Sequence, residues 1–433
     1  MEKVKVGVVG CGTVGTGTVK LLLENASVIE QRTGIRFELV KVADRDWDRP
    51  RPFEVPERLR TTDYREVLKE ADVVVELVGG KEFAKKLLLE AIELGKCTVT
   101  ANKHLLAEEG REIFRAAQKR GVFLGFEAAV GGGIPVIKAL REGLVGNRIK
   151  SILGILNGTT NYILTRMYEE GLSFEEALNE ARRLGYAEAD PTLDVDGWDA
   201  AHKITLLATL AYGSFVEFSS VFVEGIRKVE HLDVELGKEL GYTLKLLAIA
   251  KERDGEVEVR VHPTFIPSDE ALAKVSGVYN AVMIEGDFVG KTMFYGQGAG
   301  SLPTASAVVS DVVQAGVFLR KGGLVPRVDW SGRPLKLTQN FYSRYYLRFS
   351  VPDRPGVLAA VARVLADFNI SIASVLQKEK ACKIAGNDSP VVPLVILTHK
   401  AYEQDVRKAL ERVKSLPVVE KEPVLIRVEE EAY

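Results

Sequence analysis

The feature that most constrains the fold is a glycine-rich turn near the start of the chain, GCGTVG at residues 10–15. An apolar strand pattern over residues 3–9 runs into this turn, and a helical pattern follows it from Thr16 to about Ile29. The first glycine permits a tight turn, the second lets a pyrophosphate approach the backbone, and the third lets helix and strand pack closely. The pattern predicts a dinucleotide-binding unit; the alternative is a glycine-rich turn without a ligand.

The second strand of this unit, at about residues 37–43, ends in Asp44 and Arg45. An acidic residue at this point accepts hydrogen bonds from the adenosine ribose of NAD, whereas an arginine pairs with the extra phosphate of NADP. Because both residue types are present, the sequence leaves the choice between NAD and NADP open.

Strands and helices continue to alternate, with strands at 71–77 and 97–100 and helices at 81–94 and about 106–120. This alternation predicts a parallel sheet of the Rossmann type, whose ligands lie beyond the carboxyl ends of the strands. Lys103 follows one of these strand ends. It is therefore a candidate site residue, although an isolated lysine is by default a surface residue.

A strand at 122–126 leads into FEAAVGGGIP, which contains three consecutive glycines. These glycines leave backbone carbonyl groups free to turn toward a ligand or a cation, or else they form a hinge between domains. After residue 149 the pattern changes, and strands near 243–251, 256–265, 278–285 and 288–295 are joined by short turns. The second domain is therefore expected to be α/β with a largely antiparallel sheet. A helix from about Pro303 to Leu319 is expected to return to the first domain.

The segment GYAEADPTLDVDGWDAAHK, residues 185–203, carries charges where a buried helix should be apolar. In the helix expected from about Trp198 to Tyr212, Asp199 and Lys203 are four residues apart and share one face. A buried ammonium group needs carboxylate partners or tends to lose its proton, so Lys203 is a candidate for unusual chemistry. The alternative is a structural Asp199/Lys203 ion pair. Residues 157–161, NGTTN, similarly either bind a substrate or cap a helix.

Length and composition limit the classes of protein. A chain of 433 residues is expected to form two or three domains. The net charge of −2 and the absence of a Lys/Arg run argue against binding to nucleic acid. No continuous apolar run reaches about 18 residues, the length expected of a transmembrane helix. The N-terminus shows no signal peptide, and Cys11, Cys97 and Cys382 form no CxxC pair. We therefore expect a cytoplasmic protein that neither spans nor binds a membrane and has neither a disulfide framework nor a cysteine zinc site.

After residue 345 the pattern is strand 346–351, helix 357–368, strands 370–377 and 391–398, helix 402–413 and a final strand near 417–428. This βαββαβ order, with the motif DRPGVL, resembles an ACT domain, a ferredoxin-like module that commonly binds amino acids and pairs with its own copies. The resemblance implies a ligand interface at Asp353, Gly356 and Asn369 to Ile370. A βαββαβ domain that binds nothing is the alternative.

Seven motifs follow one another over about the first 320 residues: GCGTVG, VGG at 78–80, TANK at 100–103, FEAAVGGGIP at 126–135, GILNGTTNYI at 154–163, the 185–203 segment and GQGAG at 296–300. In this order and combination they resemble the homoserine dehydrogenase family. The resemblance implies reversible NAD(P)-dependent reduction of L-aspartate 4-semialdehyde to L-homoserine, in threonine, methionine and isoleucine biosynthesis. It also implies a homodimer or larger assembly, with feedback by an amino acid such as threonine through the ACT domain.

Site residues carried over from the family are assigned motif by motif. Lys203 resembles the proton donor, and Lys103 a second lysine near substrate and nicotinamide. The expected substrate-binding residues are Glu188, Asp194, Asp199, Gly158 and Thr159. The expected dinucleotide-binding residues are Gly10, Gly12, Thr13, Val14, Gly15, Arg45, Gly79, Thr100, Lys103 and Gly300. A monovalent cation, usually sodium in the family, would be held by Glu127 and the carbonyl groups of Val130, Gly132 and Ile134.

The expected organisation is a NAD(P)-binding domain over residues 1–135 plus about 300–320, a catalytic and dimerisation domain over 136–299, a linker over 321–344 and an ACT domain over 345–433. Aspartate-semialdehyde dehydrogenase would need a cysteine nucleophile, and none of Cys11, Cys97 and Cys382 is well placed for that role. Two alternatives stay open. Another ACT-containing dehydrogenase, such as a 3-phosphoglycerate dehydrogenase, would use a histidine and a carboxylate. A sensor would bind NAD(H) and an amino acid without turnover.

Overall fold

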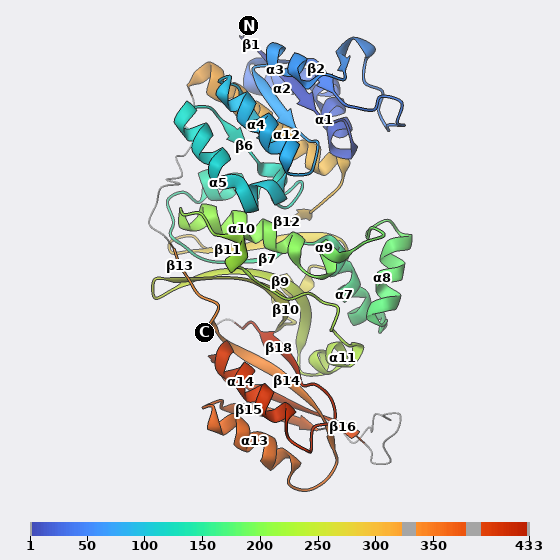
Figure 1. Cartoon of the computed structure of the whole chain (residues 1–433), viewed down its shortest axis with the longest axis vertical. Helices are drawn as coiled ribbons and strands as arrows, with labels where there is room; N and C mark the ends of the chain where they lie inside the picture. The colour runs from blue at the N-terminus through green and yellow to red at the C-terminus, as the bar shows by residue number, and fades with distance from the viewer. Residues whose placement is uncertain (1, 323–334, 378–390, 431–433) are drawn as a thin grey trace.

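The computed structural model describes residues 2–322, 335–377 and 391–430. They form three units stacked along the longest axis of the molecule, with the N-terminal unit at one end and the C-terminal unit at the other (Figure 1). Half of the expected linker, including Pro326, Arg333 and Pro334, lies outside the described residues, as does Cys382. The α/β fold class with its N-terminal Rossmann-type sheet is confirmed.

The first unit has a six-stranded, fully parallel sheet in the order β3-β2-β1-β4-β5-β6. Its strands are β1 (Glu2–Val9), β2 (Ile35–Ala43), β3 (Arg60–Thr61), β4 (Val73–Glu76), β5 (Cys97–Thr100) and β6 (Leu124–Gly125). Its first helices are α1 (Thr13–Glu24), α2 (Ala26–Thr33), α3 (Tyr64–Glu70), α4 (Glu82–Glu93) and α5 (Lys103–Arg120). The central strands are buried because helices cover both faces of the sheet, as β4 illustrates with four buried residues, three of them valines.

The single helix expected from Thr16 to about Ile29 is in fact two helices. The first begins at Thr13, directly after Gly12, and the chain leaves helical geometry at Asn25 with φ −100° and ψ 15°. Asparagine has a low helix propensity, which favours a boundary at this residue, and the Asn25 side chain makes no cap hydrogen bond to α2. The earlier start matters, because it places the first free N–H groups of α1 directly over the glycine-rich turn.

Helix α12 (Ser301–Lys321) packs against α1 and against β5 and β6 of the first sheet. Gly17 of α1 permits this approach, since a Cβ atom there would lie 2.7 Å from Ser301 Oγ. Among the described residues, α12 is the one helix long and apolar enough to cross a membrane, with a mean hydropathy of 1.4. Half of its apolar stretch is buried against the sheet, as in the core helix of a globular domain.

The second unit has antiparallel strands in the order β12-β11-β7-β9-β10, which confirms the expected second sheet. They are β7 (Ile149–Ile155), β9 (Tyr242–Arg253), β10 (Glu256–Pro267), β11 (Tyr279–Gly286) and β12 (Gly290–Gln297). Short strands β8 (Phe222–Val223) and β13 (Lys336–Leu337) add to β10 in parallel. The helices are α6 (Val136–Lys138), α7 (Gly158–Glu170), α8 (Phe174–Arg183), α9 (Thr192–Val195), α10 (Trp198–Tyr212) and α11 (His231–Glu239).

The third unit has the βαββαβ order of an ACT domain, as expected. Its elements are β14 (Tyr342–Pro352), α13 (Val357–Asp367), β15 (Ile372–Gln377), β16 (Val391–Thr398), β17 (Ala401–Tyr402), α14 (Glu403–Lys414) and β18 (Val424–Val428). Strand β18 also pairs in parallel with β10, opposite Thr264 and Phe265. The two sheets therefore form one continuous sheet across the second and third units.

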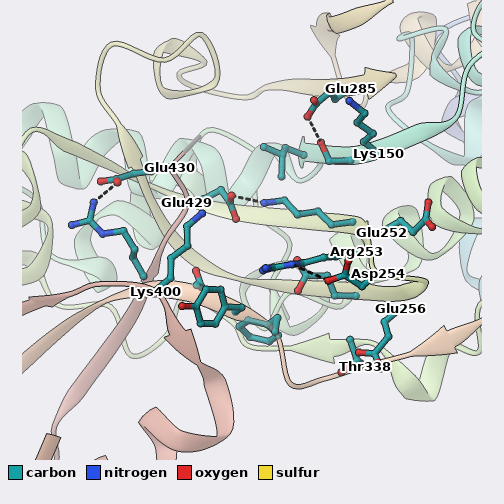
Figure 2. A pocket seen from close by; sticks show the side chains of 18 of the residues that line it. Lys150, Glu252, Arg253, Asp254, Glu256, Glu285, Thr338, Lys400, Glu429 and Glu430 are labelled. Atoms are coloured by element: carbon teal, nitrogen blue, oxygen red, sulfur yellow. Dashed lines mark hydrogen bonds and ion pairs between the residues drawn. The ribbon is translucent and has the colours of Figure 1, made fainter. Parts of the chain in front are cut away.

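Charged groups line the join between these two units. Arg348 of β14 and Asp233 of α11 are almost fully buried and lie 2.6 Å apart. Elsewhere along the join, a pocket of about 480 Å³ is lined mainly by charged residues. There Glu429 forms an ion pair with Lys251, and Glu430 forms one with Arg344 (Figure 2). A buried charge needs its partner, so the Arg348–Asp233 and Lys251–Glu429 pairs, which cross between the units, favour this docking of the third unit on the second.

Candidate active site

Lys203 lies inside α10, whose residues are buried nearly all round the helix. Its side chain is 8% exposed, and Nζ donates to Asp199 Oδ2 at 2.6 Å and to the Leu156 carbonyl oxygen at 2.5 Å. Burial lowers the pKa of Lys203, although Asp199 opposes the shift. An ammonium group with a lowered pKa gives up its proton more readily than an exposed lysine does.

Asp199 joins this lysine to the first unit. Its Oδ1 atom lies 2.9 Å from Nζ of Lys103, the first residue of α5, while Oδ2 binds Lys203. Burial alone would raise the pKa of Asp199, but the two ammonium groups hold it well below its usual value. Asp199 in turn raises the pKa of Lys103. The structure thus brings the two lysines predicted from the sequence to one carboxylate.

Asn157 connects Asp199 to the other acidic residue of the site. Its Nδ2 atom donates to Asp194 Oδ1 at 2.6 Å and to Asp199 Oδ2 at 2.9 Å. Its Oδ1 atom accepts from the Thr160 backbone N–H at 2.8 Å and so caps α7. The structure therefore shows the helix cap considered for the NGTTN segment, and the same side chain also connects Asp194 to Asp199. Binding of a substrate by this segment stays a prediction.

Asp194 is held by the neighbouring residues of the same motif. Thr159 Oγ1 lies 3.1 Å from Asp194 Oδ2 and 2.6 Å from the Tyr186 carbonyl oxygen. Burial and the nearby Asp199 raise the pKa of Asp194. Gly158 is required sterically, since a Cβ atom would lie 2.6 Å from the Val278 carbonyl oxygen. Glu188, by contrast, is exposed in the loop before α9, and its negative charge contributes to the raised pKa of Lys103.

The glycine-rich turn has the geometry that a dinucleotide requires. Gly10 has φ +98°, and a Cβ atom at Gly15 would lie 2.0 Å from the Gly10 carbonyl oxygen. A Cβ atom at Gly12 would meet no atom within 4 Å, so the space above the turn is open. The turn therefore fits a pyrophosphate at the N-terminus of α1, beside Thr13 and Val14.

The end of β2 differs from a simple ribose-binding site. Asp44 Oδ2 accepts from the Cys11 backbone N–H at 2.6 Å, so the carboxylate already supports the glycine-rich turn. Arg45 is exposed. Arg51 donates to the Cys11 carbonyl oxygen at 3.0 Å, lies 3.5 Å from Asp44 and stacks on Trp47 at 4.7 Å. Sequence reasoning missed Arg51, because forty residues separate it from the turn that it contacts.

Two further strand ends are tied together by a buried carboxylate that sequence reasoning also missed. Glu76, at the end of β4, accepts from Thr100 Oγ1 at 2.6 Å and from the Val78 backbone N–H at 2.8 Å. Thr100 then accepts from the Asn102 N–H, and Asn102 Nδ2 donates to the Gly80 carbonyl oxygen at 2.6 Å. This network fixes the turn around Gly79 next to the start of α5. Burial raises the pKa of Glu76.

The expected cation segment forms a compact turn between the first two units. Gly132 has φ +57°, and a Cβ atom there would lie 2.6 Å from the Gly298 carbonyl group, close to Gly300 at the start of α12. The Glu127 carboxylate accepts from the backbone N–H groups of Ile137 and Lys138 at 2.8 and 2.9 Å. That carboxylate is therefore engaged at the N-terminus of α6, and burial raises its pKa to about 7. The carbonyl oxygens of Glu127 and Ile134 also accept backbone hydrogen bonds, from Val130 and Val136, and binding of a cation by this turn stays a prediction.

The expected ligand residues of the ACT domain lie at the two ends of α13. Gly356, directly before the helix, has φ +90°, and Asn369, two residues after it, has φ +55°. Asp353 accepts from Gln377 Nε2 of β15 at 3.0 Å. The loop before α13 is thereby tied to strand β15, which leaves most of its side chains exposed.

Comparisons with known proteins agree with this geometry. A family model described as homoserine dehydrogenase matches residues 135–313, one described as its NAD binding domain matches 10–127, and an ACT domain model matches 345–418. Homoserine dehydrogenases of Pseudomonas aeruginosa and Neisseria gonorrhoeae are 46% and 44% identical, covering 99% of this chain and 100% and 99% of theirs.

Solved structures show the same relationship. A homoserine dehydrogenase from Thiobacillus denitrificans superposes with a TM-score of 0.90 at 44% identity over 99% of both chains. A hyperthermophilic archaeal homoserine dehydrogenase in complex with NADPH superposes with a TM-score of 0.61 at 27% identity, over 75% of this chain and all of that one. The chain thus belongs to the homoserine dehydrogenase family of oxidoreductases, with a NAD(P)-binding domain at its N-terminus and an ACT domain at its C-terminus.

Proposed function

We propose that the chain reversibly reduces L-aspartate 4-semialdehyde to L-homoserine, with Lys203 as the proton donor. The observation that carries the proposal is a single buried carboxylate, Asp199, between Nζ of Lys203 at 2.6 Å and Nζ of Lys103 at 2.9 Å. A carbonyl oxygen that gains negative charge during reduction is stabilised by a nearby ammonium group, which then protonates it. A bound nicotinamide supplies or accepts the hydride.

The surrounding residues suit an amino-acid aldehyde. Asp194 and Glu188 supply carboxylates for the substrate amino group, and Asn157 fixes the position of Asp194. Gly158 and Thr159 complete the wall of the substrate site at the start of α7. Lys103, at the start of α5, would lie between substrate and nicotinamide. Its ammonium group, whose pKa Asp199 raises, would hold the substrate rather than transfer a proton.

The nicotinamide dinucleotide would be held by the turn over residues 10–15, by the Gly79 turn, Thr100 and Gly300. NAD and NADP both remain candidates, because Asp44 is engaged with the glycine-rich turn while Arg45 and Arg51 offer positive charge beside it. A monovalent cation, sodium in this proposal, would bind the main-chain carbonyl groups of Glu127, Val130, Gly132 and Ile134.

A mechanism with a cysteine nucleophile has little support. Burial raises the pKa of Cys97 to about 11 and also raises that of Cys11, and both thiols are buried. A nucleophilic cysteine needs the opposite environment, with a lowered pKa and access to substrate. These two reduced, buried cysteines support a cytoplasmic location.

We further propose that the domains divide at residues 135, 299 and 345, that the ACT domain binds an amino-acid effector such as threonine, and that the enzyme is at least a dimer. Phe288 and Tyr295, in the β11–β12 hairpin at the sheet edge, are 89% and 56% exposed and support an association surface there. Calorimetry with threonine tests effector binding, and sedimentation of the full chain tests the oligomeric state.

The decisive experiment is an absorbance assay at the nicotinamide band with L-homoserine and either NAD or NADP. Oxidation of homoserine with either cofactor is expected, and the two rates give the preference. Cofactor binding without oxidation would instead support the non-catalytic sensor. Oxidation of 3-phosphoglycerate but not homoserine would support the other class of ACT-containing dehydrogenase.

A further inference from the structure

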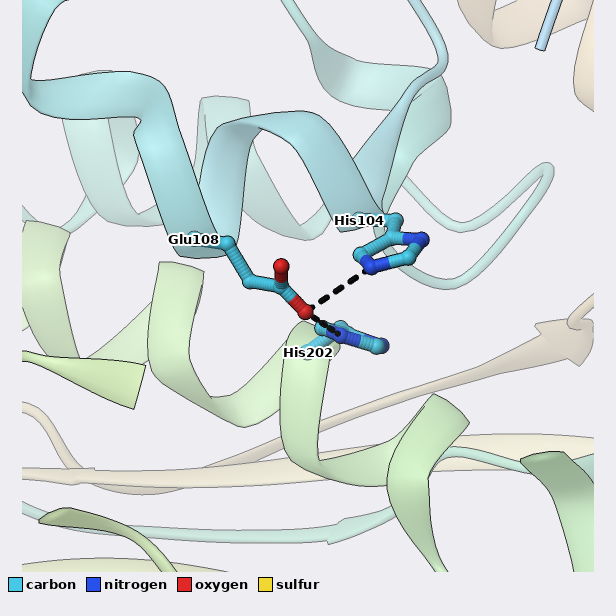
Figure 3. Close-up of side chains that lie close together, drawn as sticks. All are labelled: His104, Glu108 and His202. Carbon is cyan, nitrogen blue, oxygen red and sulfur yellow. Dashed lines mark hydrogen bonds and ion pairs between the residues drawn. The ribbon is translucent and has the colours of Figure 1, made fainter. Parts of the chain in front are cut away.

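Three potential metal ligands from two helices converge beside the two lysines. His104 and Glu108 are four residues apart on α5 and share one face, while His202 projects from α10 toward them (Figure 3). Glu108 Oε1 lies 2.8 Å from His104 Nε2 and 3.1 Å from His202 Nε2. One ligand atom from each residue lies within 4.8 Å of the others.

The packing around the cluster holds the side chains in place. The His202 ring stacks on Phe218 with a centroid distance of 4.4 Å and an interplanar angle of 10°, and lies 4.6 Å from the His104 ring. Lys81 Nζ binds the other carboxylate oxygen, Glu108 Oε2, at 2.7 Å. This contact leaves Oε1 pointing at the two imidazoles. The chain therefore fixes all three donors before any ion is bound.

The spacing suits a transition-metal ion. Zinc binds histidine nitrogen and carboxylate oxygen at about 2.0–2.2 Å in tetrahedral geometry, which separates neighbouring ligand atoms by about 3.3 Å. The two contacts of 2.8 and 3.1 Å would need to open only slightly to admit an ion. Neutral imidazole and carboxylate are ligands of Zn²⁺ and its first-row neighbours, and hard ions such as Ca²⁺ prefer oxygen alone.

We propose that His104, Glu108 and His202 form a binding site for a divalent transition-metal ion such as Zn²⁺, with an open position for water. The site is separate from the monovalent cation segment. Because His104 follows Lys103 and His202 precedes Lys203, the ion would tie α5 of the first unit to α10 of the second. It would thereby fix the two helices that carry the lysines.

The test uses the untagged full-length chain, stripped with a chelator and dialysed against Zn²⁺. One Zn²⁺ per chain is expected, with binding at least tenfold weaker in His104→Ala and in Glu108→Gln. His104 is partly exposed, so its replacement should leave the fold intact. The thermal midpoint should rise with Zn²⁺ in the wild type but not in His104→Ala.

Two matched variants separate this site from other histidines and carboxylates. Glu112→Gln alters an exposed carboxylate one turn further along α5, and His399→Ala removes an exposed histidine of the third unit. Both should bind Zn²⁺ like the wild type. Co²⁺ should give visible bands without a thiolate charge-transfer band. The proposal is overturned if the wild type binds no Zn²⁺, if His104→Ala binds it equally tightly, or if the thiolate band appears.

Discussion

The Lys103 ammonium nitrogen lies 2.9 Å from Asp199 Oδ1, across the boundary between the first and second units. Because α5 carries one residue and α10 the other, the contact exists only when the two units are docked. The second oxygen of the same carboxylate binds Lys203. A single side chain thus sets the distance between the cofactor-binding unit and the proposed proton donor.

Replacing this carboxylate tests its positioning role. Asp199→Asn keeps the shape but leaves two ammonium groups without their common partner, so turnover is expected to fall about 100-fold or more. Asp196→Asn is the matched control, because Asp196 lies three residues earlier in the chain but pairs with the partly exposed Arg227. Steady-state rates of homoserine oxidation check this. Equal losses in both variants would contradict the assignment.

Lys203→Met tests the proton donor itself. Methionine fills similar space without charge, so dinucleotide binding should survive while turnover falls by about two to four orders of magnitude. Nicotinamide fluorescence gives binding, and absorbance gives turnover. The exposed Lys228→Met serves as the control for loss of one positive charge. A near-normal rate in Lys203→Met would remove the donor from this position.

Two alanine substitutions in the glycine-rich turn should have different effects. Gly15→Ala places a Cβ atom 2.0 Å from the Gly10 carbonyl oxygen and should destabilise the fold by about 1–3 kcal/mol or more. Gly12→Ala meets no protein atom within 4 Å, so stability should be nearly unchanged while the methyl group obstructs the pyrophosphate. Thermal midpoints and cofactor titrations distinguish these outcomes. Unimpaired cofactor binding by Gly12→Ala would argue against the proposed pose.

Lys245 provides a pH-dependent test of stability. It is 3% exposed, donates to the Val275 carbonyl oxygen at 2.5 Å and to Asn161 Oδ1 at 3.1 Å, and burial lowers its pKa to about 8. Between pH 8 and about 10.4 the unfolded chain binds more protons than the folded chain, so stability rises with pH in this window.

The wild type should therefore gain thermal stability relative to Lys245→Met across that window, by at most about 3 kcal/mol. The difference in stability between the two proteins cancels the contribution of groups that titrate in both. The exposed Lys408→Met should show no such divergence from wild type. A difference in thermal stability between wild type and Lys245→Met that does not change with pH would contradict the lowered pKa of Lys245.

The buried pair at the join of the second and third units gives a further test. Arg348→Met leaves Asp233, whose side chain is fully buried, without its cation and should cost about 3–5 kcal/mol. Adding Asp233→Leu removes the uncompensated charge and should restore part of that loss. Denaturation of the single and double variants measures both effects. No recovery in the double variant would show that the pair is not the source of the loss.

Much of the fold could be predicted from local patterns. The order of an apolar strand, the GCGTVG turn and a helix is enough to predict the first part of the Rossmann-type sheet. The four-residue spacing of Asp199 and Lys203 is enough to place both on one helical face. Contacts between distant segments carry no such local signal. Arg51 contacts the turn at Cys11 from a loop forty residues away. In the sequence Glu76 follows three valines and looks like the end of an apolar strand, so its contact with Thr100 could not be predicted. The β10–β18 pairing depends on how two whole units dock.

The β10–β18 pairing also has a consequence for biosynthesis. The sheet of the middle unit gains a neighbour from residues 424–428 of the third unit, and the first unit needs the helix at 301–321, which follows the middle unit in the chain. Each of these two units therefore completes its structure only after a later part of the chain has been synthesised. A chain truncated before β18 would leave Thr264 and Phe265 of β10 without their parallel neighbour.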